Sequence, residues 1–224
     1  MSIESEEFLS FSSKINEYIS ATMFGLEMNV ENYNRDLIWE NIQSKGLRVR
    51  PFPFNGKARQ SISGMIIKDS LETTIGYNSN MSVKRINFTV SHEMIHYLYH
   101  FNEDTHFFTD TKDSLEYTLA DQLIEFQANI GASAILLPDP VLVYELKNGF
   151  SMSHISEKYG ISNSALYVRL MQSMQGYFEA NPFVASKTAA KIVNGRSKCT
   201  TKELGSNLEK KIIYTNPFYE ALCL

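Results

Sequence analysis

Cysteine is scarce in this chain of 224 residues, which contains only Cys199 and Cys223. Two cysteines cannot build the disulfide framework of a small secreted protein, and their spacing matches no metal-binding motif. Long apolar runs are missing as well, whereas a transmembrane helix needs about 20 such residues. The first seven residues include three glutamates and no basic residue, so they do not resemble a secretory signal. We therefore expect a cytoplasmic protein without a membrane segment.

Internal repeats and low-complexity tracts are also absent, and the apolar share of 43% is ordinary for a globular protein. The charge is uneven along the chain. Residues 1–148 contain 12 Lys/Arg and 20 Asp/Glu, a net of −8, whereas residues 149–224 contain 9 and 5, a net of +4. This asymmetry suits two functional surfaces, although a solvated face explains so small a basic excess as well.

The spacing of apolar residues predicts a mostly helical chain with a small three-stranded sheet, an α+β fold. Helices are expected at 3–24, 32–45, 83–99 and 114–137. Strands are expected at 47–50, 64–68 and 72–77. Ser82 can cap the third helix and Pro138 ends the fourth. Residues 102–112 read as a polar loop, and residues 211–215 suit a short strand.

Residues His92-Glu93-Met94-Ile95-His96 form the pattern H-E-x-x-H. Positions i and i+4 of an α-helix share one face, so the two imidazoles can converge on one tetrahedral Zn²⁺. Glu93 then lies where it can take a proton from a water molecule as a general base. Two surface histidines on an amphipathic helix would produce the same short pattern. A third ligand would decide between these alternatives.

Glu125 is the candidate third ligand, because it lies among apolar residues in the next long helix. Burying an unpaired carboxylate costs several kcal/mol, and a metal held by His92 and His96 would supply the missing cation. Asn129 lies one turn further on the same side and could orient a ligand imidazole. Glu125 could instead face solvent, as glutamates in helices commonly do.

At this point the chain resembles the ImmA/IrrE metallopeptidases of bacteria and their mobile elements. Residues 85–100 match the pattern R-x-x-F-T-x-A-H-E-x-x-H-x-x-x-H, with Ser91 in place of the alanine. Residues 125–138 match E-x-x-A-N-x-F-A-x-x-L-L-x-P, with Gly131 in place of the phenylalanine. A third stretch, 155–170, extends the resemblance over roughly residues 45–175.

The resemblance implies a gluzincin-like domain, in which a helix pair carrying the ligands packs on a small three-stranded sheet. It also implies His92, His96 and Glu125 as metal ligands and Glu93 as the general base. Zinc is the expected metal, one ion per chain, although Mn²⁺ and Fe²⁺ accept the same ligands. We predict a metallopeptidase domain over residues 1–148 and a helix-turn-helix-like segment with a carboxy-terminal extension over 149–224, packed on the first.

Other residues near the motif have less definite roles. His100 does not fit the metzincin spacing, which requires a ligand at position 102, so we expect it to orient other groups or to be structural. Tyr97, Tyr99 and Tyr117 are candidates for stabilising the oxyanion, although packing explains them better. His106 and His154 are expected to be ordinary surface residues.

Residues 152–170 are typical of two helices joined at Gly160, with Ser162 as the cap of the second. Ile155, Ile161, Ala165 and Val168 would pack the pair together. The second helix of a DNA-binding helix-turn-helix reads the major groove, but this one offers only Arg169 and the chain is acidic. We therefore do not expect direct DNA binding, and favour a structural or repressor-docking role.

Three functions remain open from the sequence. The first is a site-specific zinc endopeptidase, whose substrate the resemblance suggests to be a separate helix-turn-helix transcriptional repressor. The second is an anti-repressor or DNA-associated regulator that acts by binding alone, which would have no need of Glu93 as a general base. The third, a component of a toxin–antitoxin or phage-defence pair, differs in biology more than in chemistry.

Overall fold

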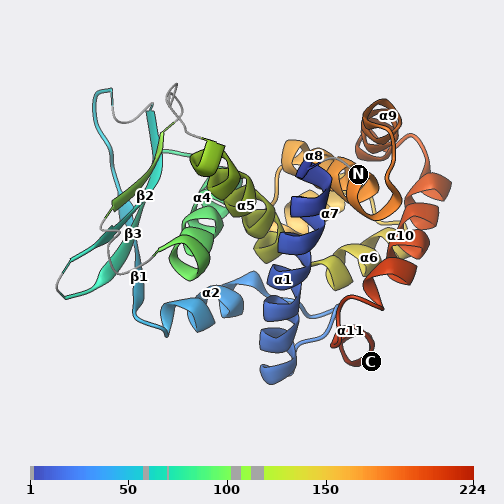
Figure 1. The fold of residues 1–224 in the computed structure, drawn as a ribbon, viewed down its shortest axis with the longest axis horizontal. Helices are drawn as coiled ribbons and strands as arrows, with labels where there is room; N and C mark the ends of the chain where they lie inside the picture. Colours follow the sequence, from blue (N-terminus) through green and yellow to red (C-terminus); the bar gives the residue numbers. More distant parts are fainter. Residues whose placement is uncertain (1–2, 58–60, 70, 102–106, 112–118) are drawn as a thin grey trace. The chain divides into compact units, whose positions relative to one another are not determined.

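The computed structural model describes residues 3–57, 61–69, 71–101, 107–111 and 119–224. The chain forms two compact units (Figure 1). The first, here called the sheet unit, consists of Trp39–Ala132, and the second, the helical unit, consists of Met1–Ile38 with Ser133–Leu224. The predicted α+β class is confirmed. The predicted functional division at residue 148 stays a prediction.

The sheet unit contains four strands in the order β1-β3-β2-β4. They are β1 (Leu47–Phe52), β2 (Ile62–Lys68), β3 (Thr73–Asn78) and β4 (Phe107–Thr111). β1 runs parallel to β3, while β2 is antiparallel to both β3 and β4. The three predicted strands are thus present. The predicted loop at 102–112 is wrong for 107–111, because these residues pair with β2, and a strand depends on a partner that local sequence does not reveal.

Two helical segments lie beside this sheet. Helix α4 (Val83–Ile95) packs on β2 and β3, as Figure 1 shows, and buries nearly every residue of its second half. Ser82 takes the N-cap position with extended backbone, as predicted, although its side chain makes no capping hydrogen bond. The helix then widens into a π-helix, η1 (His96–His100), in which Phe101 N donates to His96 O at 2.8 Å. The sequence predicted one uninterrupted α-helix here.

Helix α5 (Leu119–Leu136) begins in the sheet unit and continues into the helical unit. The predicted residues 114–118 lie outside the described ones. Gly131 of α5 lies against Ile95 of α4: a Cβ there would lie 2.5 Å from Ile95 Cδ1, and Ile95 is fully buried. A larger side chain at position 131 would displace Ile95, so glycine suits this close contact between α5 and α4.

The helical unit is built from α1 and from the helices that follow α5. Their bounds are α1 (Ile3–Gly25), α6 (Asp139–Asn148), α7 (Met152–Tyr159), α8 (Asn163–Phe178), α9 (Pro182–Val193), α10 (Lys198–Ile212) and α11 (Tyr219–Leu222), with α2 (Arg35–Gln43) leading into the sheet unit. The strand predicted at 211–215 is wrong. Leu204, Leu208 and Ile212 are buried at four-residue spacing, so α10 continues helically through Ile212.

Helices α7 and α8 form the predicted helix-turn-helix-like pair. Gly160 ends α7 with a left-handed φ of 61°, and the Ser162 hydroxyl accepts from Ala165 N at 3.1 Å. The predicted packing of Val168 is wrong, because that side chain is exposed while Leu166 and Leu170 are fully buried. The buried stripe of α8 therefore runs along Leu166 and Leu170.

Charged side chains hold this helix pair against α6. Arg169 is 1% exposed and its Nη2 lies 2.6 Å from Asp139 Oδ1, while Lys158 Nζ lies 2.8 Å from Glu145 Oε1.

Among the described helices, none alone has the length and apolar composition needed to cross a membrane, although residues 121–136 and 139–148, as a bent pair, would meet both criteria together.

Candidate metal centre

Three side chains of the sheet unit converge on one point. His92 Nε2 lies 3.0 Å from His96 Nε2 and 3.2 Å from Glu125 Oε2, and His96 Nε2 lies 3.4 Å from Glu125 Oε1. His92 comes from α4, His96 from the first residue of η1 and Glu125 from α5. Both histidines are buried and Glu125 is half-buried. The structure thus brings together the three residues predicted as ligands.

These distances fit a small tetrahedral cation. Zinc bonds of about 2.0 to 2.1 Å at tetrahedral angles would place neighbouring ligand atoms about 3.3 Å apart. The three pairs here measure 3.0, 3.2 and 3.4 Å. The group can hold a metal ion, and two imidazoles with one carboxylate leave a fourth position for water or substrate, as in catalytic zinc sites.

The Glu125 carboxylate is adapted to positive charge. Burial would raise the pKa of this group, but hydrogen bonds and charge from His92 and His96 outweigh burial and hold the pKa well below its usual range. Glu125 is therefore an anion at neutral pH. An anion facing two imidazole nitrogens is what a divalent cation requires.

Each histidine has a partner at its other ring nitrogen. Asn129 Oδ1 lies 3.2 Å from His92 Nδ1, so the residue predicted to orient a ligand does lie beside one. His100 Nδ1 lies 3.1 Å from His96 Nδ1, and His100 Nε2 lies 2.8 Å from Gln127 Oε1. Burial, the largest cause, lowers the pKa of His100 to about 4, so this imidazole is neutral at pH 7. His100 therefore contacts a predicted ligand.

Glu93, the predicted general base, is 1% exposed and follows His92 directly on α4. Its carboxylate packs against the backbone of β2 at Gly64. A Cβ at Gly64 would lie 2.8 Å from Glu93 Oε1 and 2.6 Å from Thr89 Cγ2, so only glycine leaves room for both. The Glu93 carboxylate therefore lies close against β2.

Sequence reasoning gave no role to two residues that lie at the centre, Gly64 and Gln127, and noted Gly131 only as a packing change in the family pattern. A lone glycine in a strand signals close backbone approach, which could have indicated Gly64. Nothing local distinguishes Gln127 from other polar residues of α5. Ser91, the departure from the family's alanine, accepts a hydrogen bond from Trp39 Nε1 at 3.1 Å.

The other candidates from the sequence are less central. The Tyr97 hydroxyl donates to Lys45 O at 2.7 Å, which gives it a structural partner. His154 is exposed and stacks on Phe150, with ring centroids 4.7 Å apart. His106 and Tyr117 lie outside the described residues.

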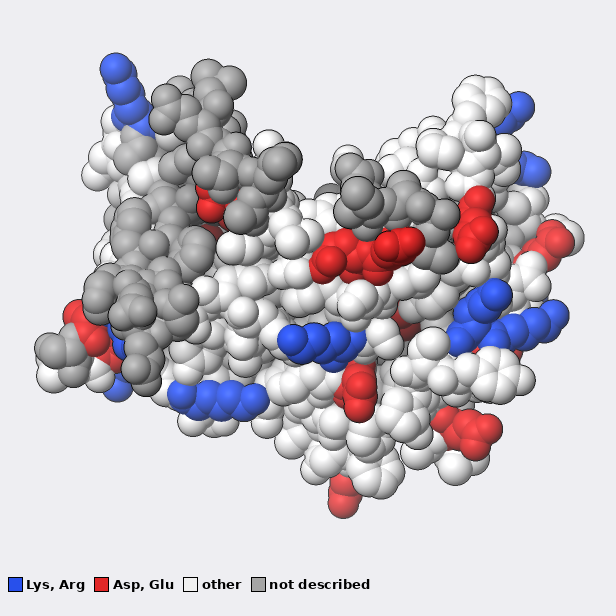
Figure 2. Space-filling model, viewed as in Figure 1, with Lys and Arg blue, Asp and Glu red and all other residues white. Residues whose placement is uncertain are grey.

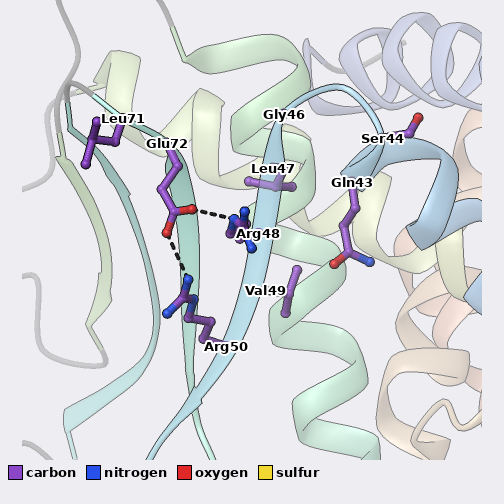
Figure 3. A pocket seen from close by; sticks show the side chains of 9 residues that line it. All are labelled: Gln43, Ser44, Gly46, Leu47, Arg48, Val49, Arg50, Leu71 and Glu72. Carbon is purple, nitrogen blue, oxygen red and sulfur yellow. Dashed lines mark hydrogen bonds and ion pairs between the residues drawn. The ribbon is translucent and has the colours of Figure 1, made fainter.

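A separate cavity of about 640 Å³ follows the edge strand β1 (Figure 3). Glu72 forms ion pairs with both Arg48 and Arg50 along this edge, the latter at 3.1 Å. The residues that line the cavity are Gln43, Ser44, Gly46, Leu47, Arg48, Val49, Arg50, Leu71 and Glu72. The metal-site residues are not among them, and the ion pairs serve to neutralise an exposed sheet edge.

A protein family described as the IrrE N-terminal-like domain has a model that matches residues 42–171, more than half of the chain. The chain belongs to this family. The match confirms the predicted ImmA/IrrE resemblance and contains every residue of the candidate centre. Membership in the IrrE-like family, a peptidase family, supports a metallopeptidase.

Among curated proteins, the radiation response metalloprotease IrrE of Deinococcus radiodurans is 30% identical to this IrrE-like chain over 110 residues. The match covers 47% of this chain and 33% of that protein. This chain thus aligns with about a third of the relative's length. The likeness supports the metalloprotease class, while substrate and partners require separate argument.

Proposed function

We propose that this chain is a zinc-dependent, site-specific endopeptidase that cleaves a separate helix-turn-helix transcriptional repressor and so relieves repression. One observation carries the enzymatic part. Glu93 lies buried on the same helical run as His92 and His96, whose Nε2 atoms converge with the Glu125 carboxylate. A module that acts by binding alone has no need of a buried carboxylate between two ligands.

His92, His96 and Glu125 would hold the metal. When bound, zinc supplies a Lewis acid that polarises the scissile carbonyl and makes a water molecule more acidic. Glu93 takes a proton from that water as its oxygen bonds to the carbonyl carbon. The same carboxyl group then gives the proton to the amine nitrogen as the C–N bond breaks. Gly64, which has no Cβ, leaves room for the Glu93 carboxylate beside β2.

Zinc is the proposed metal because two imidazoles and a carboxylate form a known catalytic zinc set. Mn²⁺ and Fe²⁺ accept the same donors, so metal analysis of protein purified without added metal is part of the test. The cytoplasm is the proposed location, since both cysteines are free and exposed, a state that a reducing compartment preserves.

Direct DNA binding is not part of the proposal. Arg169, the basic residue of α8 that could have faced a groove, is buried against Asp139. Among the described residues on the face drawn in Figure 2, acidic and basic side chains are interspersed and form no continuous basic field. A repressor-docking role for the carboxy-terminal helices is more compatible with these features.

The test is to incubate the zinc-loaded protein with candidate helix-turn-helix repressors and to follow the products by mass spectrometry. The wild type should cut one bond. Glu93→Gln keeps the size of the side chain but cannot accept the proton, so the rate should fall by about 10² to 10⁴ while zinc content stays the same.

A transcription assay with the repressor and its operator separates cleavage from binding. Wild type should relieve repression and Glu93→Gln should not. If both relieve repression equally and the repressor stays intact, the protein acts by binding, and the peptidase proposal is wrong.

A further inference from the structure

A chain of side-chain contacts leads away from His96 on the side opposite to the converging Nε2 atoms. His96 Nδ1 lies 3.1 Å from His100 Nδ1, and His100 Nε2 lies 2.8 Å from Gln127 Oε1. The two rings are close, with centroids 5.0 Å apart and planes at 64°. His96 is 1% exposed, so its Nδ1 is shielded from bulk water and the protein determines its hydrogen bond.

Proton positions along this chain follow from the chemistry of metal binding. An imidazole that binds a metal through Nε2 must carry its proton on Nδ1. His96 Nδ1–H then donates to His100 Nδ1, which must be unprotonated. His100 Nε2, which lies 2.8 Å from Gln127 Oε1, then carries a proton and donates it to that oxygen.

The opposite direction would disable the ligand. If the Gln127 amide donated to His100 Nε2, His100 would carry its proton on Nδ1 and donate it to His96 Nδ1. His96 would then be protonated on Nε2, the atom that faces His92 and Glu125. The amide orientation of Gln127 therefore decides whether His96 can bind a metal.

Helix α5 supplies three side chains that contact the histidines of α4 and η1. Glu125 contacts both Nε2 atoms, Gln127 contacts His100, and Asn129 contacts His92 Nδ1. The π-helical turn at His96–His100 provides the other side of the contact, and such turns are frequent at functional sites.

We propose that His100 and Gln127 are positioning residues that hold His96 in its Nδ1–H tautomer and so present its Nε2 lone pair to the metal. Asn129 does the same for His92 by direct contact, whereas for His96 two residues act in series. This inference rests on the proposed function, because it assumes that His96 is a metal ligand.

Zinc affinity measured by chelator competition tests the proposal. His100→Phe removes the acceptor while keeping a ring, so zinc should bind about 10 to 100 times more weakly. His100→Asn places an amide oxygen near the position of Nδ1 and should restore affinity to within about threefold of wild type. Gln127→Leu should weaken binding about tenfold. Gln122→Leu, the same change at an exposed site on α5, should have no effect.

Tautomers give a readout that does not depend on affinity. The chain has five histidines, so long-range ¹H–¹⁵N spectra of the zinc-loaded protein can be assigned. Wild type should show His96 protonated on Nδ1 and His100 on Nε2. In zinc-free protein, where no metal-bound His96 fixes the tautomer, wild type should keep the His100 proton on Nε2, and Gln127→Leu should show both His100 tautomers in exchange. These spectra remain informative if His100→Phe fails to fold.

Two negative results have different meanings. If wild type binds zinc but His100→Phe and Gln127→Leu bind it equally well, the positioning role is wrong and the proposed peptidase stands. If wild type binds no divalent metal, the proposed function fails first and the positioning role fails with it.

Discussion

Buried charge is handled differently in the two units of this protein. In the described part of the helical unit, the buried carboxylates Asp139 and Glu145 have basic partners, Arg169 and Lys158 respectively. In the sheet unit, the Glu125 carboxylate instead faces the Nε2 atoms of two imidazoles. In the first arrangement the chain itself supplies the opposite charge, whereas the second is suited to an added cation.

The difference distinguishes buried polar groups that stabilise the fold from polar groups that can bind a ligand. A buried ion pair is costly to form and is strongly destabilising when one member is lost, so Asp139–Arg169 fixes how α8 lies on α6. Acceptor atoms that converge at about 3 Å gain little from each other without a shared proton or metal. Both units contain buried charged groups. What distinguishes the metal centre from the Asp139–Arg169 ion pair is the kind of atom that faces the carboxylate: imidazole nitrogens in the first and a guanidinium in the second.

The largest expected effect comes from removing the third ligand. Zinc binding at a full protein site is worth roughly 10 to 16 kcal/mol, so one ligand of three or four should account for about a thousandfold in affinity. Glu125→Ala should therefore abolish zinc binding at micromolar concentration, as measured by native mass spectrometry. The control is Glu203→Ala, the same change at an exposed position on α10. Equal zinc content in Glu125→Ala and wild type would remove this residue from the ligand set.

The next largest effect is expected from breaking the Asp139–Arg169 ion pair of the helical unit, and it concerns the stability of the fold. Arg169→Met leaves Asp139 buried without its guanidinium and should lower the free energy of unfolding by about 3 to 5 kcal/mol. Urea denaturation measures this change, and Arg196→Met at an exposed site is the matched control. The double variant Arg169→Met/Asp139→Leu should recover most of the loss. If Arg169→Met were as stable as wild type, the Asp139–Arg169 pair would not hold α8 against α6.

A methyl group at Gly64 should affect catalysis more than metal binding. Gly64→Ala places a carbon against Glu93 Oε1 and Thr89 Cγ2, and such overpacking costs about 1 to 3 kcal/mol. We expect kcat to fall by at least about tenfold while zinc affinity changes little, since the ligands come from other elements. Gly25→Ala is the control, because a Cβ there meets nothing within 4 Å. Unchanged kcat in Gly64→Ala would show that β2 does not position Glu93.

The smallest effect concerns alkaline pH and is specific to the helical unit. Burial, the largest cause, raises the pKa of Tyr33, Tyr159, Tyr177 and Tyr219 above the ordinary value of 10.0. Above pH 10 these tyrosines ionise in the unfolded state only. The unfolded state then binds fewer protons, so the free energy of unfolding falls as pH rises.

Tyr177→Phe separates the pH effect from packing. The Tyr177 hydroxyl donates to Asp139 Oδ2 at 3.0 Å, and its loss should cost about 1 kcal/mol at pH 7. Above pH 10 the variant should lose stability less steeply than wild type, because one of the titrating groups is gone. Denaturation curves at pH 7, 10 and 11 measure both changes, and parallel pH dependences would contradict the assignment.

The sequence by itself determined the elements and residue types of the candidate centre. Helical spacing put His92 and His96 on one face, and the paired motifs pointed to Glu125 and Asn129 on the next long helix. These are local patterns, and residues four apart on a helix must share a face whatever surrounds them. The three strands β1, β2 and β3 were also readable from short β-branched runs.

Only the tertiary structure decided the features that depend on a distant partner. β4 exists because β2 lies beside it, and Arg169 is buried because Asp139 is there to pair with it. The roles of Gln127 and Gly64 likewise depend on residues from other elements, at separations of 27 residues for Gln127 and His100. No local pattern encodes such contacts, because they form only when packing brings separate segments of the chain together.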